Sequence, residues 1–171
     1  MTSAELLLDA FDRIKGVVHG AVDGLSREQL VTQIEPAANS IGWLVWHLTR
    51  IQDDHIADAF DLDQVWTAGG WADRFALPFG TAATGYGHRS ADVAKVVADA
   101  ALLTGYHDAV QQQTVAQLRG LVDGDLTRIV DEAWDPPVSL GVRLVSVISD
   151  GLQHAGQAAF VRGVLTRRDR R

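Results

Sequence analysis

Four long segments repeat apolar residues at alternating steps of three and four, and this spacing restricts the chain to a helical fold. They cover residues 4–21, about 40–59, 90–118 and 139–166. Such spacing places apolar side chains on one face of each helix, where they can pack against other helices. No segment keeps the alternation of a strand. We therefore predict an all-α four-helix bundle, with residues 1–171 in a single domain.

Residues that cap helix N-termini stand at the starts of the last three segments. They are Asn39 or Ser40, then Ser90, and then Ser139 after a pair of prolines. Their short polar side chains accept hydrogen bonds from the first free N–H groups of a helix. Between the last two long helices we expect one further short helix, at 123–133.

The connection between the second and third helices, residues 61–89, is long and rich in aromatic residues and glycine. A connection of this length inside one domain is unusual and often functional. It is long enough to recross a bundle of 20-residue helices, about 30 Å, so the helices on either side of it could run parallel. Its composition suits a lid or the wall of a pocket. A loop packed by its own side chains is the alternative.

The composition excludes several classes of function. The net charge is −7, which argues against a nucleic-acid-binding surface. The chain has no cysteine, so thiolate zinc sites and a cysteine nucleophile are excluded. The acidic N-terminal segment does not resemble a signal peptide, and no apolar run approaches the ~18 residues of a membrane span. We expect a cytoplasmic protein that acts on a small molecule.

Asp150 and His154 lie four residues apart in the predicted helix 139–166, so they occupy the same helix face, one turn apart. That face carries an apolar stripe, formed by Val147, Asp150, His154, Ala158, Val161 and Leu165. A carboxylate and an imidazole on a core-facing stripe cost free energy unless a partner compensates them. A divalent metal ion is one such partner, and an ordinary helical ion pair is the other interpretation.

The candidate third ligand is His47, which borders the predicted core from the second helix. Two imidazoles and one carboxylate leave a coordination position open, as in catalytic zinc sites, and nickel, iron or manganese accept the same ligands. Asp54 and His55 are alternate ligands, but they lie roughly 11–12 Å further along the same helix and cannot join His47 around one ion. His107, on the stripe of segment 90–118, is interpreted as a core histidine.

Other catalytic motifs are missing from the sequence. There is no G-x-S-x-G element for a serine nucleophile, and neither a Walker loop nor G-x-G-x-x-G for a nucleotide. The three candidate ligands are therefore the main indication of chemistry that the residues alone provide.

Two stretches, SIGWLVWHLTRIQDDH at 40–55 and LVSVISDGLQHAGQAAFVRG at 144–163, resemble the DinB superfamily of helical bundles. The likeness continues through WTAGGW at 66–71 and DPPVSLGVRL at 135–144. The branch that the chain looks most like contains the mycothiol-dependent maleylpyruvate isomerases and related thiol transferases. The resemblance implies an up-down-down-up bundle with a long second-to-third crossover, and homodimers.

The resemblance also implies a metal site. The family places one histidine ligand on the second helix, matching His47, and two ligands four residues apart on the last helix, matching Asp150 and His154. Many members have histidine at the first of those two positions, and the isomerase branch has glutamate. Asp150 departs from both, because it keeps the carboxylate on a side chain that is one methylene shorter.

The implied activity is that of a transferase or isomerase in which a divalent ion activates a low-molecular-weight thiol, such as mycothiol, or water. Without cysteine, the reacting thiol must come from a small molecule. We predict that five further residues contact the substrate or support the ligands: Trp43, Asp54, His55, Gln157 and Arg162. A surface salt bridge is the alternative role for Arg162. The alternative functions are a binding protein with a small-ligand cavity under the Trp-rich loop, and a scaffold that has lost its chemistry.

Overall fold

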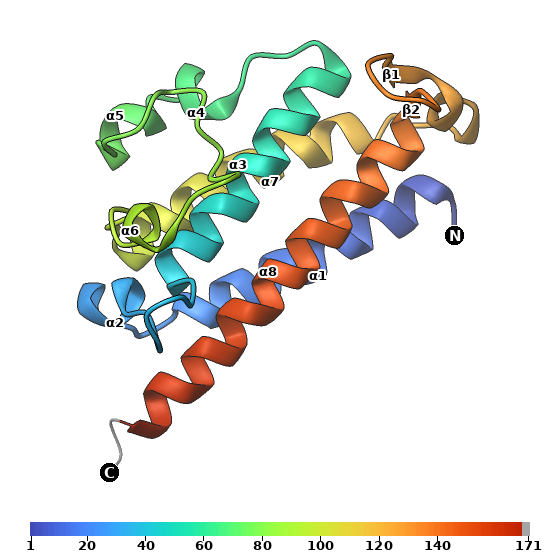
Figure 1. Ribbon diagram of the computed structural model, residues 1–171. Helices are drawn as coiled ribbons and strands as arrows, with labels where there is room; N and C mark the ends of the chain where they lie inside the picture. Colours follow the sequence, from blue (N-terminus) through green and yellow to red (C-terminus); the bar gives the residue numbers. More distant parts are fainter. Residues whose placement is uncertain (169–171) are drawn as a thin grey trace.

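The computed structural model describes residues 1–168 and is mostly helical, which confirms the all-α prediction. The predicted domain extends to residue 171, and its last three residues lie outside the described part. Four long helices pack side by side (Figure 1): α1 (Ser3–Val22), α3 (Ile41–Phe60), α7 (Ala100–Leu118) and α8 (Leu140–Arg168). Both α1 and α3 contact α7 and α8. Their apolar faces together form one core.

The starts of the long helices follow from their capping residues. The Ser40 hydroxyl accepts a hydrogen bond from the Trp43 N–H (3.2 Å), so α3 begins at the next residue, Ile41. The Ser139 hydroxyl accepts one from the Val142 N–H (3.4 Å) at the start of α8. These two caps confirm the predicted starts of α3 and α8, the two helices that carry the candidate ligands.

The predicted helix 90–118 is wrong in its first third. The structure has a single turn, α6 (Ser90–Val93), and a non-helical segment before α7. Asp99 ends this segment, because its carboxylate caps α7 by accepting from the Leu102 N–H (2.8 Å). Val93, the last residue of α6, and Val96, inside the non-helical segment, are both buried. Their spacing of three residues imitates a continuous helix, so the pattern gave no sign of the interruption.

The short helix predicted at 123–133 is present only in its first five residues, as a 3₁₀ helix. A short 3₁₀ turn, η1 (Asp123–Thr127), leads into β1 (Ile129–Asp131), which pairs antiparallel with β2 (Val138–Ser139). The expectation that no strand would occur fails here. Strands of three and two residues are too short to show an alternating pattern. This hairpin lies at the end of the molecule where α8 begins (Figure 1).

The remaining helices are short and lie in the connections. They are α2 (Arg27–Val31), α4 (Val65–Ala68) and α5 (Trp71–Phe75). Two of them, α4 and α5, belong to the long connection 61–89, which packs on α3 and α7 by its own aromatic side chains. Trp66 and Phe75 both contact the ring of Tyr106, with centroids 5.2 and 5.8 Å from it. No helix within residues 1–168 combines the length and apolar character needed to cross a bilayer.

His107 is fully buried in α7, as the core interpretation expects. The Thr49 hydroxyl donates to the Val45 carbonyl (2.7 Å), so its oxygen accepts from Nδ1–H of His107 (3.2 Å). Nε2 is then the bare nitrogen, and it has no partner among the described residues. Burial lowers the pKa of His107 to about 4, so the imidazole is neutral in the folded protein at pH 7.

Acid is therefore expected to destabilise the fold through His107. The unfolded chain binds a proton at this residue below about pH 6.5, while the folded chain resists protonation down to about pH 4. Stability from this group is complete above pH 6.5 and falls as the pH drops from 6.5 to 4, by up to about 3 kcal/mol. Urea unfolding of the wild type and of His107→Gln across this window tests the effect. An equal loss of stability in both proteins would contradict it.

Candidate metal centre

Three of the predicted site residues meet between α3 and α8. His47 comes from α3, and Asp150 and His154 come from α8, one turn apart. One potential ligand atom from each of these residues lies within 4.8 Å of the other two. The centroids of the two imidazole rings are 4.8 Å apart, and His154 Nε2 is 3.4 Å from Asp150 Oδ1. The cluster contains two imidazoles and one carboxylate, the ligand types of catalytic zinc sites.

The seam of α8 that faces the core runs beside the two ligands and not through them. Its buried residues around the cluster are Val147, Gly151, Ala155 and Ala158. At Gly151 α8 packs closely on α1, since a Cβ there would stand 3.1 Å from Ile14 Cδ1. Asp150 and His154 are only half-buried at the edge of this seam. The predicted apolar stripe, which ran through Asp150 and His154, was therefore wrong by about one residue. The buried stripe runs through Gly151 and Ala155, and the two ligands are accessible from solvent.

Each imidazole is oriented by an oxygen on its Nδ1 side. Nδ1 of His47 donates to the Thr84 carbonyl (2.6 Å), because a carbonyl oxygen can only accept. Nδ1 of His154 is 2.9 Å from Oε1 of Gln157, also an acceptor. Both Nε2 atoms are left for another partner. Metal-binding histidines commonly have this arrangement, with an oxygen that fixes the ring and its tautomer.

The carboxylate of Asp150 lacks part of its expected hydrogen bonding. Its Oδ2 atom is buried and has no partner within residues 1–168. Its Oδ1 atom faces Nε2 of His154, whose own proton is on Nδ1 when the ring is neutral. Two lone pairs would then face each other, so the pair needs a proton or a cation between them. A divalent ion would satisfy this requirement and also the free Oδ2.

The electrostatic environment differs for the two histidines. Burial lowers the pKa of His47, which is thus neutral and able to offer its lone pair at pH 7. The hydrogen bond with Asp150 raises the pKa of His154. Protonated His154 fits the metal-free site, where the proton takes the position between the ring and the carboxylate.

Aromatic rings enclose the cluster on one side. The Trp43 ring stacks on His47, with centroids 4.6 Å apart and planes 15° apart, and meets the His154 ring edge-on at 6.3 Å. Its indole N–H donates to Nδ1 of His88 (3.1 Å). Trp43 was predicted to lie near the ligands, and it forms a wall that fixes both imidazoles.

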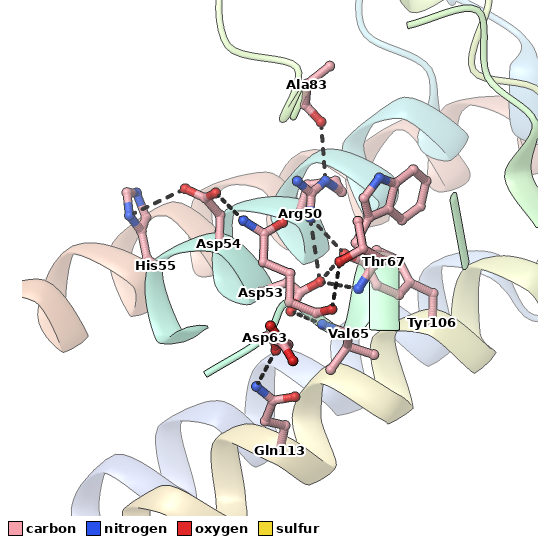
Figure 2. A network of polar contacts seen from close by, with 12 residues as sticks. Arg50, Asp53, Asp54, His55, Asp63, Val65, Thr67, Ala83, Tyr106 and Gln113 are labelled. Atoms are coloured by element: carbon pink, nitrogen blue, oxygen red, sulfur yellow. Dashed lines mark hydrogen bonds and ion pairs between the residues drawn. The ribbon is translucent and has the colours of Figure 1, made fainter. Parts of the chain in front are cut away.

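Asp54 and His55 are not part of the cluster of three. Asp54, which is labelled in Figure 2, accepts a hydrogen bond from Gln64 (2.7 Å). His55 Nδ1 accepts from Arg143 (3.1 Å). Arg162 donates to main-chain carbonyls at the end of α1, those of Ala21 and Asp23. Of the five residues predicted beside the ligands, Trp43 and Gln157 contact a ligand in the structure.

The chain is similar to known proteins along most of its length. The family model described as mycothiol-S-transferase matches residues 6–167. The chain belongs to the mycothiol-S-transferase family. This confirms the resemblance to the thiol-transferase branch of the DinB superfamily. A solved structure, of a conserved protein from Enterococcus faecalis, is 31% identical with a TM-score of 0.88, and the match covers 95% of this chain and 96% of that chain. No curated protein matches the chain.

Sequence reasoning about this member of the mycothiol-S-transferase family missed the residues that support His47 from the long connection. Thr84 supplies the accepting carbonyl, and Gly85 follows it with φ +95°, a conformation that favours glycine. A Cβ at residue 85 would also stand 2.8 Å from His47 Nδ1 and 3.0 Å from the Trp46 ring. The glycines at 85 and 87 were visible signals, but nothing in the sequence indicated which carbonyl would face the histidine.

Proposed function

We propose that the protein is a metal-dependent transferase or isomerase whose nucleophile is a low-molecular-weight thiol such as mycothiol, or water. The observation that carries the proposal is the convergence of His47, Asp150 and His154, with one carboxylate oxygen left unpaired. Membership of the mycothiol-S-transferase family favours a thiol and implies a small-molecule substrate.

In this proposal His47, Asp150 and His154 hold one divalent ion, zinc or alternatively nickel, iron or manganese. When bound, the ion lowers the pKa of the thiol or water that it contacts, and so supplies a nucleophile at neutral pH. The half-burial of Asp150 and His154 leaves one side of the site open to a small molecule. Asp150 is shorter than the family's glutamate, yet its Oδ1 still reaches within 3.4 Å of His154 Nε2.

The residues around the ligands keep them in place. The Thr84 carbonyl and Gln157 hold the two imidazoles so that Nε2 of each points away from its hydrogen-bonded side. Trp43 excludes water from the face of His47, because it stacks there and is itself buried. The chain has no cysteine, so the sulfur that reacts enters with the thiol cofactor.

We extend the proposal to the architecture that the resemblance implies: one domain, an up-down-down-up bundle, and a homodimer. The contacts of α1 and α3 with both α7 and α8 support the bundle. The length of the connection 61–89 supports the crossover that joins two parallel helices.

Thiol consumption tests the proposed activity. Metal-loaded protein is mixed with mycothiol and a panel of electrophiles such as 1-chloro-2,4-dinitrobenzene, and loss of free thiol is followed. We expect consumption above the uncatalysed rate with at least one electrophile, and none above it with His47→Ala. Failure of all electrophiles would favour the second candidate function, a small-ligand or metal-binding protein without catalysis, for which the cavity described below is the supporting observation.

Replacing Gly85 with alanine is expected to weaken metal binding by about 10–100-fold, the range for loss of support behind a ligand. The new Cβ would collide with His47 Nδ1 and displace the ring from the Thr84 carbonyl. Isothermal titration with Zn²⁺ measures the change. Gly87→Ala is the matched control, since Gly87 also has positive φ (+76°) but no atom within 4 Å of its added Cβ. Equal affinities of the two variants would contradict the steric argument.

A further inference from the structure

We propose that a cavity beneath the connection 61–89 is a second binding site, for a small aromatic molecule that carries a neutral hydrogen-bond acceptor. The cavity has a volume of about 290 Å³ and lies between α3 and the segment that contains α4 and α5. None of the three candidate metal ligands lines it. The proposal therefore goes beyond the metal-dependent function and does not depend on it.

The cavity has the size and the walls for one aromatic ligand. A dry cavity of about 150 Å³ is already enough to bind benzene. Trp46, Trp66 and Phe79 line the space, and the ring centroids of Trp66 and Phe79 lie 6.4 and 6.1 Å from that of Trp46. The ring planes are inclined by 67° and 33°, so the walls offer both edges and faces to a flat guest.

Three buried nitrogens, two on residues that line the cavity and one on Arg50 behind them, have no hydrogen-bond acceptor among the described residues. The indole N–H groups of Trp46 and Trp66 have no partner within residues 1–168, although both side chains are almost fully buried. Nη2 of Arg50, which is completely buried, also lacks one. Each unpaired buried donor costs free energy, because it has lost its hydrogen bond to water. A ligand oxygen that pairs with one of them recovers that cost, which an apolar ligand cannot do.

Arg50 lies behind the cavity lining and contacts two of its residues, Trp66 and Ala83. Its guanidinium lies 5.1 Å from the centre of the Trp66 ring, and its Nε donates to the carbonyl of Ala83, a lining residue (3.1 Å; Figure 2). The positive charge is already balanced by Asp53, whose Oδ2 is 3.4 Å away. Asp73 adds an exposed negative charge to the lining. A neutral acceptor such as a ketone is therefore favoured over a carboxylate.

The three nitrogens are covered by neighbouring atoms in the ligand-free cavity. An acceptor reaches one of them only when a lining ring rotates, so the indole N–H groups themselves should report binding. The chain has five tryptophans and gives five indole cross-peaks in a ¹H–¹⁵N spectrum. Trp134, which is 66% exposed, lies outside the cavity and serves as an internal reference.

The test is an NMR titration of the metal-free protein, residues 1–171, with acetophenone, toluene and benzoate, after assignment of the indole peaks. We expect acetophenone to move the peak of Trp46 or Trp66 downfield and to leave that of Trp134 in place. Toluene, which has no acceptor, should bind more weakly and cause no downfield shift, and benzoate should bind at least about tenfold more weakly than acetophenone, equivalent to about 1.4 kcal/mol. Absence of any shift at Trp46 and Trp66, or equal shifts with toluene, would overturn the proposal.

A pair of variants locates the site. Ala72 lines the cavity, whereas Ala68 is exposed and does not, and both lie in the same connection. Ala72→Leu is expected to weaken acetophenone binding by at least about tenfold, equivalent to about 1.4 kcal/mol, and Ala68→Leu to leave it unchanged. Equal affinities would place the ligand elsewhere and overturn the proposal. Should Ala72→Leu fail to fold, the wild-type titration decides alone. All measurements are made without metal, so their outcome is separate from that of the thiol assay.

Discussion

Replacement of His154 by alanine is expected to abolish stable metal binding, with an affinity at least roughly 100-fold below that of the wild type. The reason is that a site with three protein ligands keeps only two, and the loss exceeds the 10–100-fold typical of a supporting residue. Wild-type protein loaded with Zn²⁺ and dialysed should retain roughly one ion per chain, a stoichiometry that follows from one three-ligand cluster. Elemental analysis and titration calorimetry measure the two quantities.

Two further variants separate coordination from general damage to α8. Gln153 is exposed, and its side-chain amide bonds to Ser149 of its own helix, so Gln153→Ala should keep full metal content. Asp150→Asn keeps the size of the side chain but removes the charge, and it should lose metal as His154→Ala does. Circular dichroism should give the same helix content for all three. Retention of the ion by His154→Ala, or by Asp150→Asn, would remove the basis of the metal-dependent function.

The helices that carry the candidate ligands were predictable, because their signals are local. Ser40 and Ser139 cap α3 and α8 at the expected positions. Side chains four residues apart on one helix must lie on the same face, so Asp150 and His154 were paired by their spacing alone. The position of His47 opposite them needed the packing of two helices that are far apart in sequence, which the resemblance to a known family supplied and the structure reproduces.

The rest depended on contacts that no periodic pattern describes. The Thr84 carbonyl reaches His47 from a segment without a long helix, so its role follows only from the folded path of the connection. Arg162 was placed near the site by its position on α8, but its long side chain reaches the end of α1. The break before α7 was hidden because Val96, which lies inside it, is buried and keeps a helical spacing of three residues from Val93. The spacing of apolar residues indicates which side chains are buried, but buried residues at helical spacing can also occur in a segment that is not helical.

The buried network around Asp53 attaches the connection 61–89 to the helices (Figure 2). Its carboxylate accepts hydrogen bonds from the Val65 and Trp66 N–H groups (2.8 and 2.7 Å) and from the Tyr106 hydroxyl (2.7 Å). Arg50 provides the opposite charge, with Nη1 3.4 Å from Oδ2. Burial raises the pKa of Asp53, and these four partners oppose that rise. One side chain therefore joins α3, α4 and α7.

Replacement of Asp53 by alanine is expected to lower the free energy of unfolding by about 3–5 kcal/mol, the cost of leaving one partner of a buried ion pair uncompensated. The variant would leave the fully buried charge of Arg50 without its carboxylate. It would also remove the acceptor of three hydrogen bonds, from the Val65 and Trp66 N–H groups and the Tyr106 hydroxyl. Asp54→Ala, at the next residue, is the control, because Asp54 is half-exposed and its main hydrogen-bond partner is Gln64; it should cost no more than about 1 kcal/mol. Urea unfolding at pH 7 measures both.

Because Asp53 holds α4 in place, the variant should also unfold the connection locally, seen as faster amide hydrogen exchange at Val65 and Trp66 than in Asp54→Ala. Similar unfolding free energies for the two variants would show that the network contributes little to stability, and that aromatic packing on Tyr106 alone holds the connection.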